Sequence, residues 1–368
     1  MKFLKIIFTI VSAYTTFCQS TKSQTPTHFE ADKMFKKIML KEHIPGLAYA
    51  VIKDGRVLYM GTQGLESIPY KKSVTTNTAF QLASCSKIYT ALLLGRLFDD
   101  KILNQDATIS QYIDSIPLAW KNITILQLAS HQSGIAIADY SKASNADQTL
   151  QIAKQQKLEY QPGQRSFYVS SDYWILQAII EKVTGLSYFE ALKKYVLKPL
   201  SLNHSFVNNV TNSDLISLDI IPDIAQEYHW HKEDSTLRIS EMWFGKAGYT
   251  AGGIYASIND LAKIAIELDR SSFISKKTKQ LISNPVLLNN GTPGEFGLGL
   301  VVNNNYQGHK IIEHSGGPAL ADFVRFDKEK YTFIVLTNNR GTYPYLAKAL
   351  ATLFIKKLSM PTLPPGYN

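Results

Sequence analysis

The sequence predicts an α/β (α+β) fold in which both ends of the chain build one antiparallel sheet flanked by helices. Short apolar segments separated by polar turns, a pattern typical of strands, fill much of residues 28–75 and 270–358. Helical periodicity prevails in residues 76–269, which we expect to form an inserted, mainly helical lobe. No repeat or long polar linker divides the chain. We therefore expect one domain over residues 28–358, with a cleft between its two lobes.

The first residues predict a secretory signal that precedes the fold. Lys2 and Lys5 precede the apolar stretch 6–17, which is too short to span a membrane comfortably. The polar residues 19–27 follow as a tether. We expect residues 1–18 to be removed by cleavage after Cys18, because the residues before it fit a lipoprotein cleavage box badly; lipid attachment to Cys18 is the alternative. The mature protein would then be periplasmic or extracellular.

The two ends of the chain carry the strand signals. Residues 30–42 have the pattern of an amphipathic helix, and the apolar segments 47–52 and 57–60 are joined around Asp54-Gly55, a strong hairpin signal. The last hundred residues return to strands. They predict strands at 296–302, 310–314, 323–326 and 332–336, turns at 303–305 and 327–330, a helix at 346–358 and a Pro-rich tail at 359–368.

The middle of the chain carries helix-start and helix-stop signals. Capping-box patterns, in which a hydroxyl residue is followed three positions later by a second polar residue, occur at Thr124, Ser187 and Ser257. Gly185 follows an apolar helical segment over residues 173–184 and predicts its end. We expect the helix after Ser187 to reach Pro199 and the one after Ser257 to cover residues 261–268.

Composition and charge exclude several classes of protein. With 45% hydrophobic and 19% charged residues, the chain is an ordinary globular protein. Its net charge of +9 falls to +7 once the two lysines of the signal are removed, and the remaining basic residues are scattered along the chain. A nucleic-acid binder would concentrate them, so we expect no nucleic-acid partner and some affinity for an anionic envelope surface. Cys85 would be the one remaining cysteine, which leaves no intramolecular disulfide.

Ser84 and Lys87 form the first candidate for chemistry. They lie three positions apart where a loop enters the apolar helix 88–94, so they would share a helix face. Burial disfavours the charged form of a lysine, and an uncharged amine beside a hydroxyl can take its proton. An S-x-x-K pattern alone is common by chance. Cys85 is a rival nucleophile, but Lys87 would face elsewhere from it, and a small buried thiol is the better interpretation.

Two further stretches hold groups that acyl transfer needs. Tyr168, in a loop that enters a helix, could hold or pass a proton, although a tyrosine that only anchors its loop is the simpler interpretation. His314-Ser315-Gly316-Gly317 ends a predicted strand, where glycines allow a substrate close to the backbone and an N–H could help to bind an oxyanion. A glycine-rich strand end is the structural alternative.

Together, the three stretches resemble the serine β-lactamase and penicillin-binding-protein superfamily. Ser84-x-x-Lys87, Tyr168-x-Ser170 and His314-Ser315-Gly316 follow the order of its S-x-x-K, Y-x-N and K-T-G or H-x-G motifs. The likeness is greatest to the group of class C β-lactamases, DD-carboxypeptidases and related esterases, and it covers about residues 28–358. Further segments similar to family landmarks are 44–47, 51–55, 123–134, 251–254, 296–299 and 336–338.

The resemblance implies a secreted serine hydrolase that needs no cofactor or metal. In such an enzyme Ser84 becomes acylated, Lys87 and Tyr168 transfer the protons, and the N–H groups of Ser84 and Gly317 form the oxyanion hole. His314 replaces the motif lysine and would orient Tyr168 or a substrate carboxylate. The substrate, a small molecule or a peptidoglycan fragment, would contact Ser170, His314, Ser315 and Gly316.

One departure from the family pattern bears on the substrate. The family's Y-x-N asparagine is Ser170 here, and a serine hydroxyl is shorter and offers fewer hydrogen bonds than an amide. This weakens the case for efficient β-lactam hydrolysis more than the case for acylation. Nothing in the sequence matches the deacylating glutamate of class A enzymes. D-amino peptides, β-lactams and small esters therefore all stay open as substrates.

Three other interpretations compete with a serine acyl-enzyme. His229, His231 and Asp234 resemble the H-x-H-x-D of zinc hydrolases, but the aspartate comes one position late, and surface histidines on a hairpin are the simpler interpretation. A Ser-His-Asp hydrolase is disfavoured because the sequence has no G-x-S-x-G elbow. A non-catalytic envelope protein that keeps the fold and binds peptidoglycan fragments or a partner is the remaining alternative.

Overall fold

The structure is a computed structural model of the 368-residue chain. The predicted signal peptide, the tether, Cys18 and the last six residues of the predicted tail lie outside the residues that it describes. Within those residues, every helix is too short or too polar to cross a lipid bilayer. The structure describes residues 28–139, 143, 145–207, 211–212, 216–217, 220–240, 248–270, 272–317, 320–341 and 345–362.

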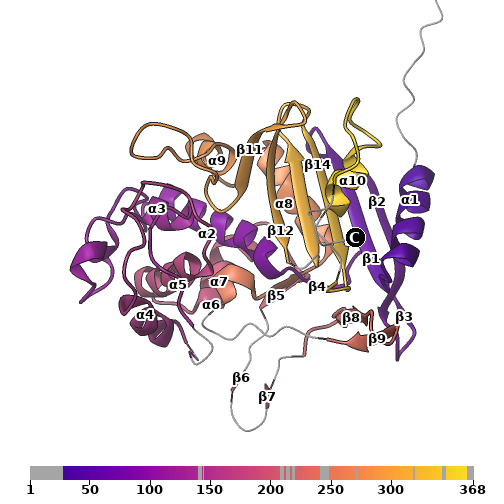
Figure 1. The fold of residues 1–368 in the computed structure, drawn as a ribbon, viewed down its shortest axis with the longest axis horizontal. Coiled ribbons are helices and arrows are strands. Elements are labelled where there is room, and N and C mark those ends of the chain that lie inside the picture. Colours follow the sequence, from indigo (N-terminus) through magenta and orange to yellow (C-terminus); the bar gives the residue numbers. More distant parts are fainter. Residues whose placement is uncertain are drawn as a thin grey trace, which may run out of the picture.

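A seven-stranded antiparallel sheet joins the two ends of the chain, as predicted (Figure 1). Its strand order is β11-β12-β13-β14-β1-β2-β3, so β1 (Gly46–Lys53) and β14 (Tyr331–Thr337) pair near its middle. The hairpin turn at Asp54-Gly55 has positive φ at both residues, which matches strand twist. The other strands are β2 (Arg56–Ser67), β3 (Lys72–Ser73), β11 (Val301–Tyr306), β12 (His309–Gly316) and β13 (Ala321–Phe326).

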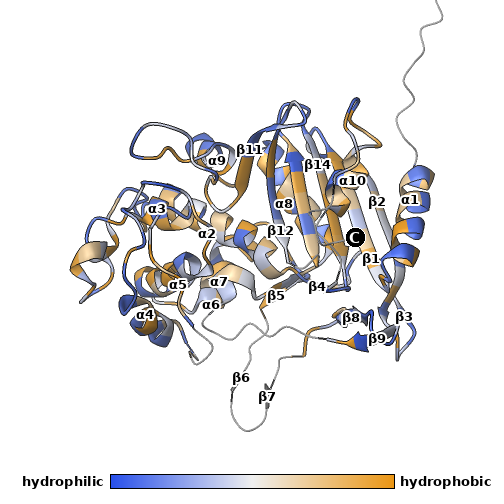
Figure 2. Cartoon of the chain, viewed as in Figure 1, coloured by the Kyte–Doolittle hydropathy of each residue, from blue (hydrophilic) through white to orange (hydrophobic). Residues whose placement is uncertain are grey.

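The sheet is buried on both faces because a separate hydrophobic core covers each one. Along β1, Ala48 and Ala50 belong to the core shared with the helical part of the molecule, whereas Leu47 and Tyr49 belong to a second core. Helices α1 (His28–Lys41) and α10 (Leu346–Ala351) form that second core with the sheet. Burial on both faces explains why β1 is almost continuously apolar and why Figure 2 colours the central strands largely hydrophobic.

The helical part lies at one side of the sheet and is built around α2 (Lys87–Asp99), which is buried along most of its length (Figure 1). Both hydrogen bonds of the predicted capping box at Thr124 are present. Gly185, at φ +66°, ends α5 (Ser170–Thr184) as predicted. The other helices here are α3 (Ile125–Ala129), α4 (Ala146–Lys154), α6 (Tyr188–Leu192), continued by a π-helical turn over Lys193–Leu197, and α7 (Tyr249–Gly252).

Two helices lie on the other side of the expected boundary between the lobes. Helix α8 (Ile258–Arg270), which we assigned to the helical lobe, packs against β1 and β14, because its strongly amphipathic apolar face covers the sheet. Helix α9 (Lys276–Ser283), which we assigned to the sheet lobe, packs against α2. Each lobe therefore contains one helix from the sequence range that we assigned to the other lobe. The chain crosses between the lobes more often than the strand and helix signals indicate.

Three local predictions near the C-terminal end were wrong in extent. The strand expected from residue 296 begins only at Val301, because Gly297 and Gly299 let the backbone pack tightly against α9 and α2 in an irregular path. The expected turn at 303–305 lies within β11, and the chain turns instead at Gln307-Gly308, both at positive φ. Helix α10 ends at Ala351 and continues as turns.

Smaller elements complete the described chain. A three-stranded sheet of order β4-β10-β5 lies beside the 3-10 helix that leads into α2. The predicted histidine-rich segment forms a two-stranded hairpin. These strands are β4 (Phe80–Gln81), β5 (Ser205–Val207), β10 (Ile254–Ala256), β8 (Tyr228–His231) and β9 (Thr236–Ile239), with the pair β6 (Thr211–Asn212) and β7 (Ile216–Ser217).

Candidate active site

Ser84 lies in a 3-10 helix, Ala83–Ser86, that runs directly into α2. Ala83 takes a left-handed φ of +44°, so the chain turns sharply just before the serine. The Cys85 thiol donates a 2.8 Å hydrogen bond to the His314 carbonyl of β12, which ties this turn to the edge of the sheet. Burial raises the pKa of the Cys85 thiol well above its usual range, so Cys85 is the small buried thiol that we predicted.

A chain of two hydrogen bonds connects Lys87, Tyr168 and Ser84. The Lys87 Nζ lies 2.8 Å from the Tyr168 hydroxyl, and that hydroxyl lies 2.8 Å from the Ser84 Oγ. Lys87 is fully buried, whereas Tyr168 is 39% exposed. The three side chains that the sequence motifs select therefore meet at one point, with the amine inside and the serine and phenol on the accessible side.

The surroundings of Lys87 hold its amine in place. Its Nζ also donates to the carbonyl of Ala251 at 2.9 Å, and the rings of Tyr168 and Tyr173 lie 4.9 and 5.1 Å from it. Two acceptors and two ring faces fix the position of an otherwise flexible side chain. Ala251 belongs to a segment whose sequence resembles a family landmark, but the sequence alone did not show that its carbonyl accepts from Lys87.

Two glycines bring the end of β12 against the serine turn. A Cβ on Gly316 would lie 1.9 Å from the Leu82 carbonyl oxygen, so only glycine allows this close approach. A Cβ on Gly317 would meet no described atom within 4 Å. Gly317 follows Gly316 directly and therefore lies next to the Ser84 turn, and its role as an oxyanion-hole donor stays a prediction.

His314 lies on β12 with its ring 6.0 Å from that of Tyr168. Its Nδ1 lies 2.9 Å from the Ser315 carbonyl, so Nδ1 carries the proton and Nε2 is an acceptor. Nε2 is buried without a hydrogen-bond partner among the described residues. Burial, and next the nearby Lys87, lower the pKa of His314 to about 3. A neutral ring can offer Tyr168 or a substrate a hydrogen-bond acceptor, but it cannot supply the positive charge of the lysine in K-T-G.

The surroundings of Ser315 and Ser170 bear on the contact that we expect each to make with the substrate. The Ser315 hydroxyl donates to Asp322, whose carboxylate also accepts the Ala347 N–H of α10, so this hydroxyl lies on the sheet face that α10 covers. The side chain of Ser315 therefore points away from Ser84, which lies toward the helical part. Ser170 is the first residue of α5, and within the described residues its hydroxyl makes no hydrogen bond to Lys87.

A buried pair that the sequence analysis did not single out lies directly behind Tyr168. The His131 ring packs against the Tyr168 ring at a tilt, with 4.7 Å between centroids, and its Nδ1 lies 3.3 Å from a carboxyl oxygen of Asp172. Both side chains are fully buried. His131 belongs to the 123–134 segment that resembles a family landmark, and Asp172 follows Tyr168 by four positions. Those two signals could have indicated the pair, but not its contact with Tyr168.

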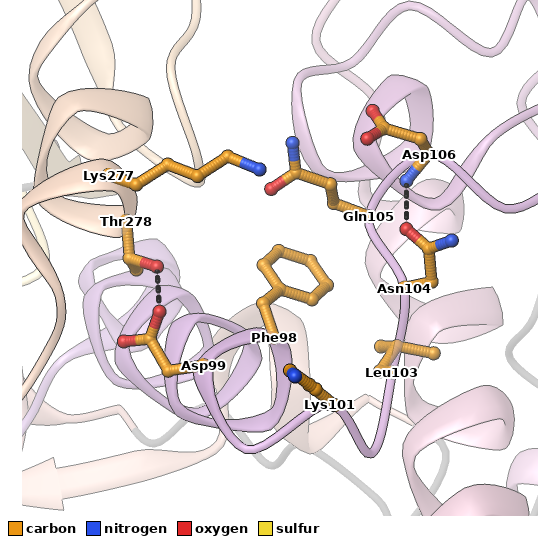
Figure 3. Close-up of a pocket in the computed structure, with 9 residues that line it drawn as sticks. All are labelled: Phe98, Asp99, Lys101, Leu103, Asn104, Gln105, Asp106, Lys277 and Thr278. Carbon is orange, nitrogen blue, oxygen red and sulfur yellow. Dashed lines mark hydrogen bonds between the residues drawn. The ribbon is translucent and has the colours of Figure 1, made fainter.

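Two other regions contribute no group to this site. The β8–β9 hairpin brings the rings of His229 and His231 to 5.0 Å, yet within the described residues no three His, Cys, Asp or Glu side chains form a metal-binding group. Figure 3 shows a pocket of about 290 Å³ at the C-terminal end of α2, opposite the end that carries Lys87. Asp99, Gln105 and Lys277 line this pocket, and none of the site residues does.

The fold and this constellation are those of a serine hydrolase family. The family model described as Beta-lactamase matches residues 31–354, and the chain belongs to this family. Among relatives, the chain is 27% identical over 329 residues to penicillin-binding protein 4* of Bacillus subtilis, covering 85% of this chain and 72% of that protein. It is 27% identical over 279 residues to a β-lactamase of Escherichia coli, covering 72% and 70%.

A third relative and a solved structure extend the comparison. The chain is 25% identical over 319 residues to the teichoic acid D-alanine hydrolase of Staphylococcus aureus, covering 84% of this chain and 75% of that one. The structure of the octameric penicillin-binding protein homologue from Pyrococcus abyssi superposes with a TM-score of 0.74 at 27% identity, covering 88% and 77%. At the level of the family, these findings support a serine hydrolase that works through an acyl-enzyme.

Proposed function

We propose that this protein is a secreted serine hydrolase that forms an acyl-enzyme on Ser84 and cleaves an amide or ester bond. The observation that carries the proposal is the hydrogen-bond chain from Lys87 through Tyr168 to Ser84, with both distances at 2.8 Å. Its substrate would be a peptidoglycan-type D-amino peptide, a β-lactam or a small ester, and no cofactor takes part. The names of the relatives are compatible with each of these classes.

The proposed reaction uses each group in turn. The Ser84 Oγ attacks the carbonyl carbon while its proton passes to the Tyr168–Lys87 pair. The N–H groups of Ser84 and Gly317 stabilise the oxyanion, and the pair then returns the proton to the leaving group as the scissile bond breaks. Water, deprotonated by the same pair, attacks the acyl-enzyme, and the proton goes back to Ser84 as the acid is released.

The side chains near the serine favour some substrates over others. Because His314 is neutral and the Ser170 hydroxyl makes no hydrogen bond to Lys87 within the described residues, the site lacks the cation and the amide with which the family pattern holds a carboxylate and an acylamide group. We therefore expect small esters to be turned over faster than β-lactams. A panel of a D-amino peptide, a β-lactam and a p-nitrophenyl ester on the wild type and Ser84→Ala measures this order.

The decisive test of the proposal is covalent labelling. An activated phosphonate should add one adduct to the wild type and none to Ser84→Ala, as measured by intact mass, with peptide mapping to Ser84. The failure of the wild type to form any adduct, even at high phosphonate or penicillin concentration, would instead support the non-catalytic envelope protein that binds peptidoglycan fragments on the same fold.

Secretion is a separate part of the proposal. It rests on the basic and apolar residues of the predicted signal at 1–18. Expression of the full chain in a bacterial host should yield a periplasmic or released product that begins after Cys18. A lipid-modified Cys18, detected by mass and lost in Cys18→Ser, would replace the soluble form with an anchored one. Four exposed lysines of α1 would add attraction to an anionic envelope surface: Lys33, Lys36, Lys37 and Lys41.

A further inference from the structure

One residue of the neighbouring turn, His131, contacts the loop that carries Tyr168 on both sides of the tyrosine. The Phe167 N–H donates to the His131 main-chain carbonyl at 2.8 Å, and the Val169 N–H points at the His131 Nδ1 at 3.4 Å. These two donors belong to the residues on either side of Tyr168. The His131 ring also packs against the Tyr168 ring in a tilted contact, with 4.7 Å between the ring centroids. One histidine therefore contacts the phenol and the peptide groups before and after it.

The proton arrangement around His131 follows from these contacts. The Val169 N–H donates to the His131 Nδ1, which has a single lone pair, so this nitrogen carries no proton and the ring is neutral. Nε2, which then holds the ring proton, is buried without a hydrogen-bond partner among the described residues. Asp172 lies 3.3 Å from the same Nδ1, and a neutral carboxyl there avoids repulsion between two acceptors. The Ser133 hydroxyl donates to the other oxygen of Asp172 at 2.5 Å. Burial acts in the same direction, since it raises the pKa of Asp172 and lowers that of His131.

The backbone of His131 is also shaped for this task. Its φ of +56° is left-handed, a conformation that few residues adopt without cost. This conformation turns the main-chain carbonyl toward Phe167 and the ring toward Val169 at the same time. Tyr168 also contacts Lys87, Phe296 and His314, and this turn adds the contacts that hold the backbone on both sides of it.

We propose that His131 is a positioning residue for Tyr168, which it fixes between Lys87 and Ser84 by holding both flanking residues and one face of the ring. The inference rests on the proposed function, because it assigns His131 a role in that reaction. It differs from a role in folding alone: the effect of His131 on the rate should pass through the Tyr168 hydroxyl. A displacement of a catalytic group by about 1 Å can lower a rate by about 10²-fold.

The test compares His131→Asn with His131→Gly in the purified mature chain. Both residues accept a left-handed φ, but only the asparagine keeps a side-chain acceptor for the Val169 N–H. With an activated phosphonate as probe, we expect His131→Gly to lower the limiting rate of Ser84 labelling by about 100-fold. The phosphonate concentration that gives half the limiting rate should change little. The limiting rate of His131→Asn should stay within about tenfold of wild type.

A double-mutant cycle separates positioning from folding. In a Tyr168→Phe background, His131→Gly should lower the limiting rate of Ser84 labelling by less than about threefold, because the hydroxyl that His131 positions is already absent. The proposal would be overturned if His131→Gly lowered the labelling rate equally in the two backgrounds, or if His131→Asn labelled as slowly as His131→Gly. Phe296→Leu serves as the matched control, since Phe296 packs against both rings without a hydrogen bond and should cost little in either background.

Amide hydrogen exchange makes the result independent of catalysis. The Phe167 and Val169 N–H groups should exchange slowly in wild type, and the Val169 group should exchange faster in His131→Gly than in His131→Asn. If wild type forms no adduct, the proposed function fails, while the exchange data still decide whether His131 holds the loop. Unchanged exchange in His131→Gly would overturn the positioning role even if labelling succeeds.

Discussion

The two regions that meet at the site reach it by different means. Ser84 and Lys87 are three residues apart on one continuous turn and helix, so their proximity follows from local geometry. Tyr168 comes from a distant loop and depends on long-range contacts with His131 and Lys87. The comparison teaches that the nucleophile is placed by secondary structure, whereas the phenol is placed by packing of one loop on another.

Replacing Lys87 should have the largest effect on activity. Lys87→Met keeps the length of the side chain but removes the amine that completes the proton path, so acylation should fall by roughly 10³- to 10⁴-fold. Stability should change little or rise, because an apolar side chain avoids the desolvation of a buried amine. Labelling kinetics and thermal unfolding measure both quantities. A loss below tenfold would show that Tyr168 alone moves the proton.

Removing the Tyr168 hydroxyl should have the next largest effect. Tyr168→Phe deletes the atom that bridges Lys87 and Ser84, and we expect acylation to fall by about 10²- to 10³-fold. The melting temperature should stay within a few degrees of wild type, because the tyrosine is partly exposed. A large fall in the melting temperature would mean that the Tyr168 hydroxyl stabilises the fold. The contrast between the Ser84 turn and the Tyr168 loop would then be wrong.

The third prediction uses two neighbouring glycines that differ in their surroundings. A Cβ on Gly316 would collide with the Leu82 carbonyl, so Gly316→Ala should push β12 away from the Ser84 turn and cost about 1–3 kcal/mol of stability. Gly317→Ala is the matched control, because its Cβ would enter open space. Thermal unfolding and labelling of both variants measure the difference. Equal stability of the two variants would contradict the close approach of the backbones.

The sequence predicted the fold well where the signals are local. Helix α1, the β1–β2 hairpin, the capping box at Thr124 and the end of α5 at Gly185 all follow from short patterns. That both ends share one antiparallel sheet also followed, and the structure shows that β1 and β14 are the strands that join them. Family resemblance supplied the selection of Tyr168, since a tyrosine in a loop has no catalytic signal of its own.

The features that escaped prediction all depend on contacts between distant segments. The irregular path around Gly297 and Gly299 results from packing against α9 and α2, which no strand pattern encodes. The Ser315 hydroxyl turns toward Asp322 because β12 and β13 place the two opposite each other, and this register could not be derived from residue spacing. The contact of His131 with the Tyr168 loop escaped for the same reason.

The smallest predicted effect concerns the pH dependence of stability. The pKa of His314 is near 3 in the folded protein, against an ordinary value of 6.5, so the folded state resists its protonation. The stability that His314 contributes is therefore fully present above pH 6.5 and is lost as the pH falls toward 3. His314→Gln removes this titration. Between pH 6.5 and 5, at about 1.36 kcal/mol per pH unit, the wild type should lose about 2 kcal/mol relative to the variant.

Chemical denaturation of both proteins at a series of pH values measures this difference directly. Asp172 titrates in both proteins and cancels in the comparison, whereas His131, whose pKa His314 helps to lower, makes a smaller contribution of its own. Above pH 7.5 the difference should be constant, since the neutral ring then predominates in both the folded and the unfolded states. A difference that does not change down to pH 5 would mean that the ring charges as easily in the fold as in water. His314 could then supply the positive charge of the family lysine, and substrates with a carboxylate beside the scissile bond would regain the advantage over simple esters.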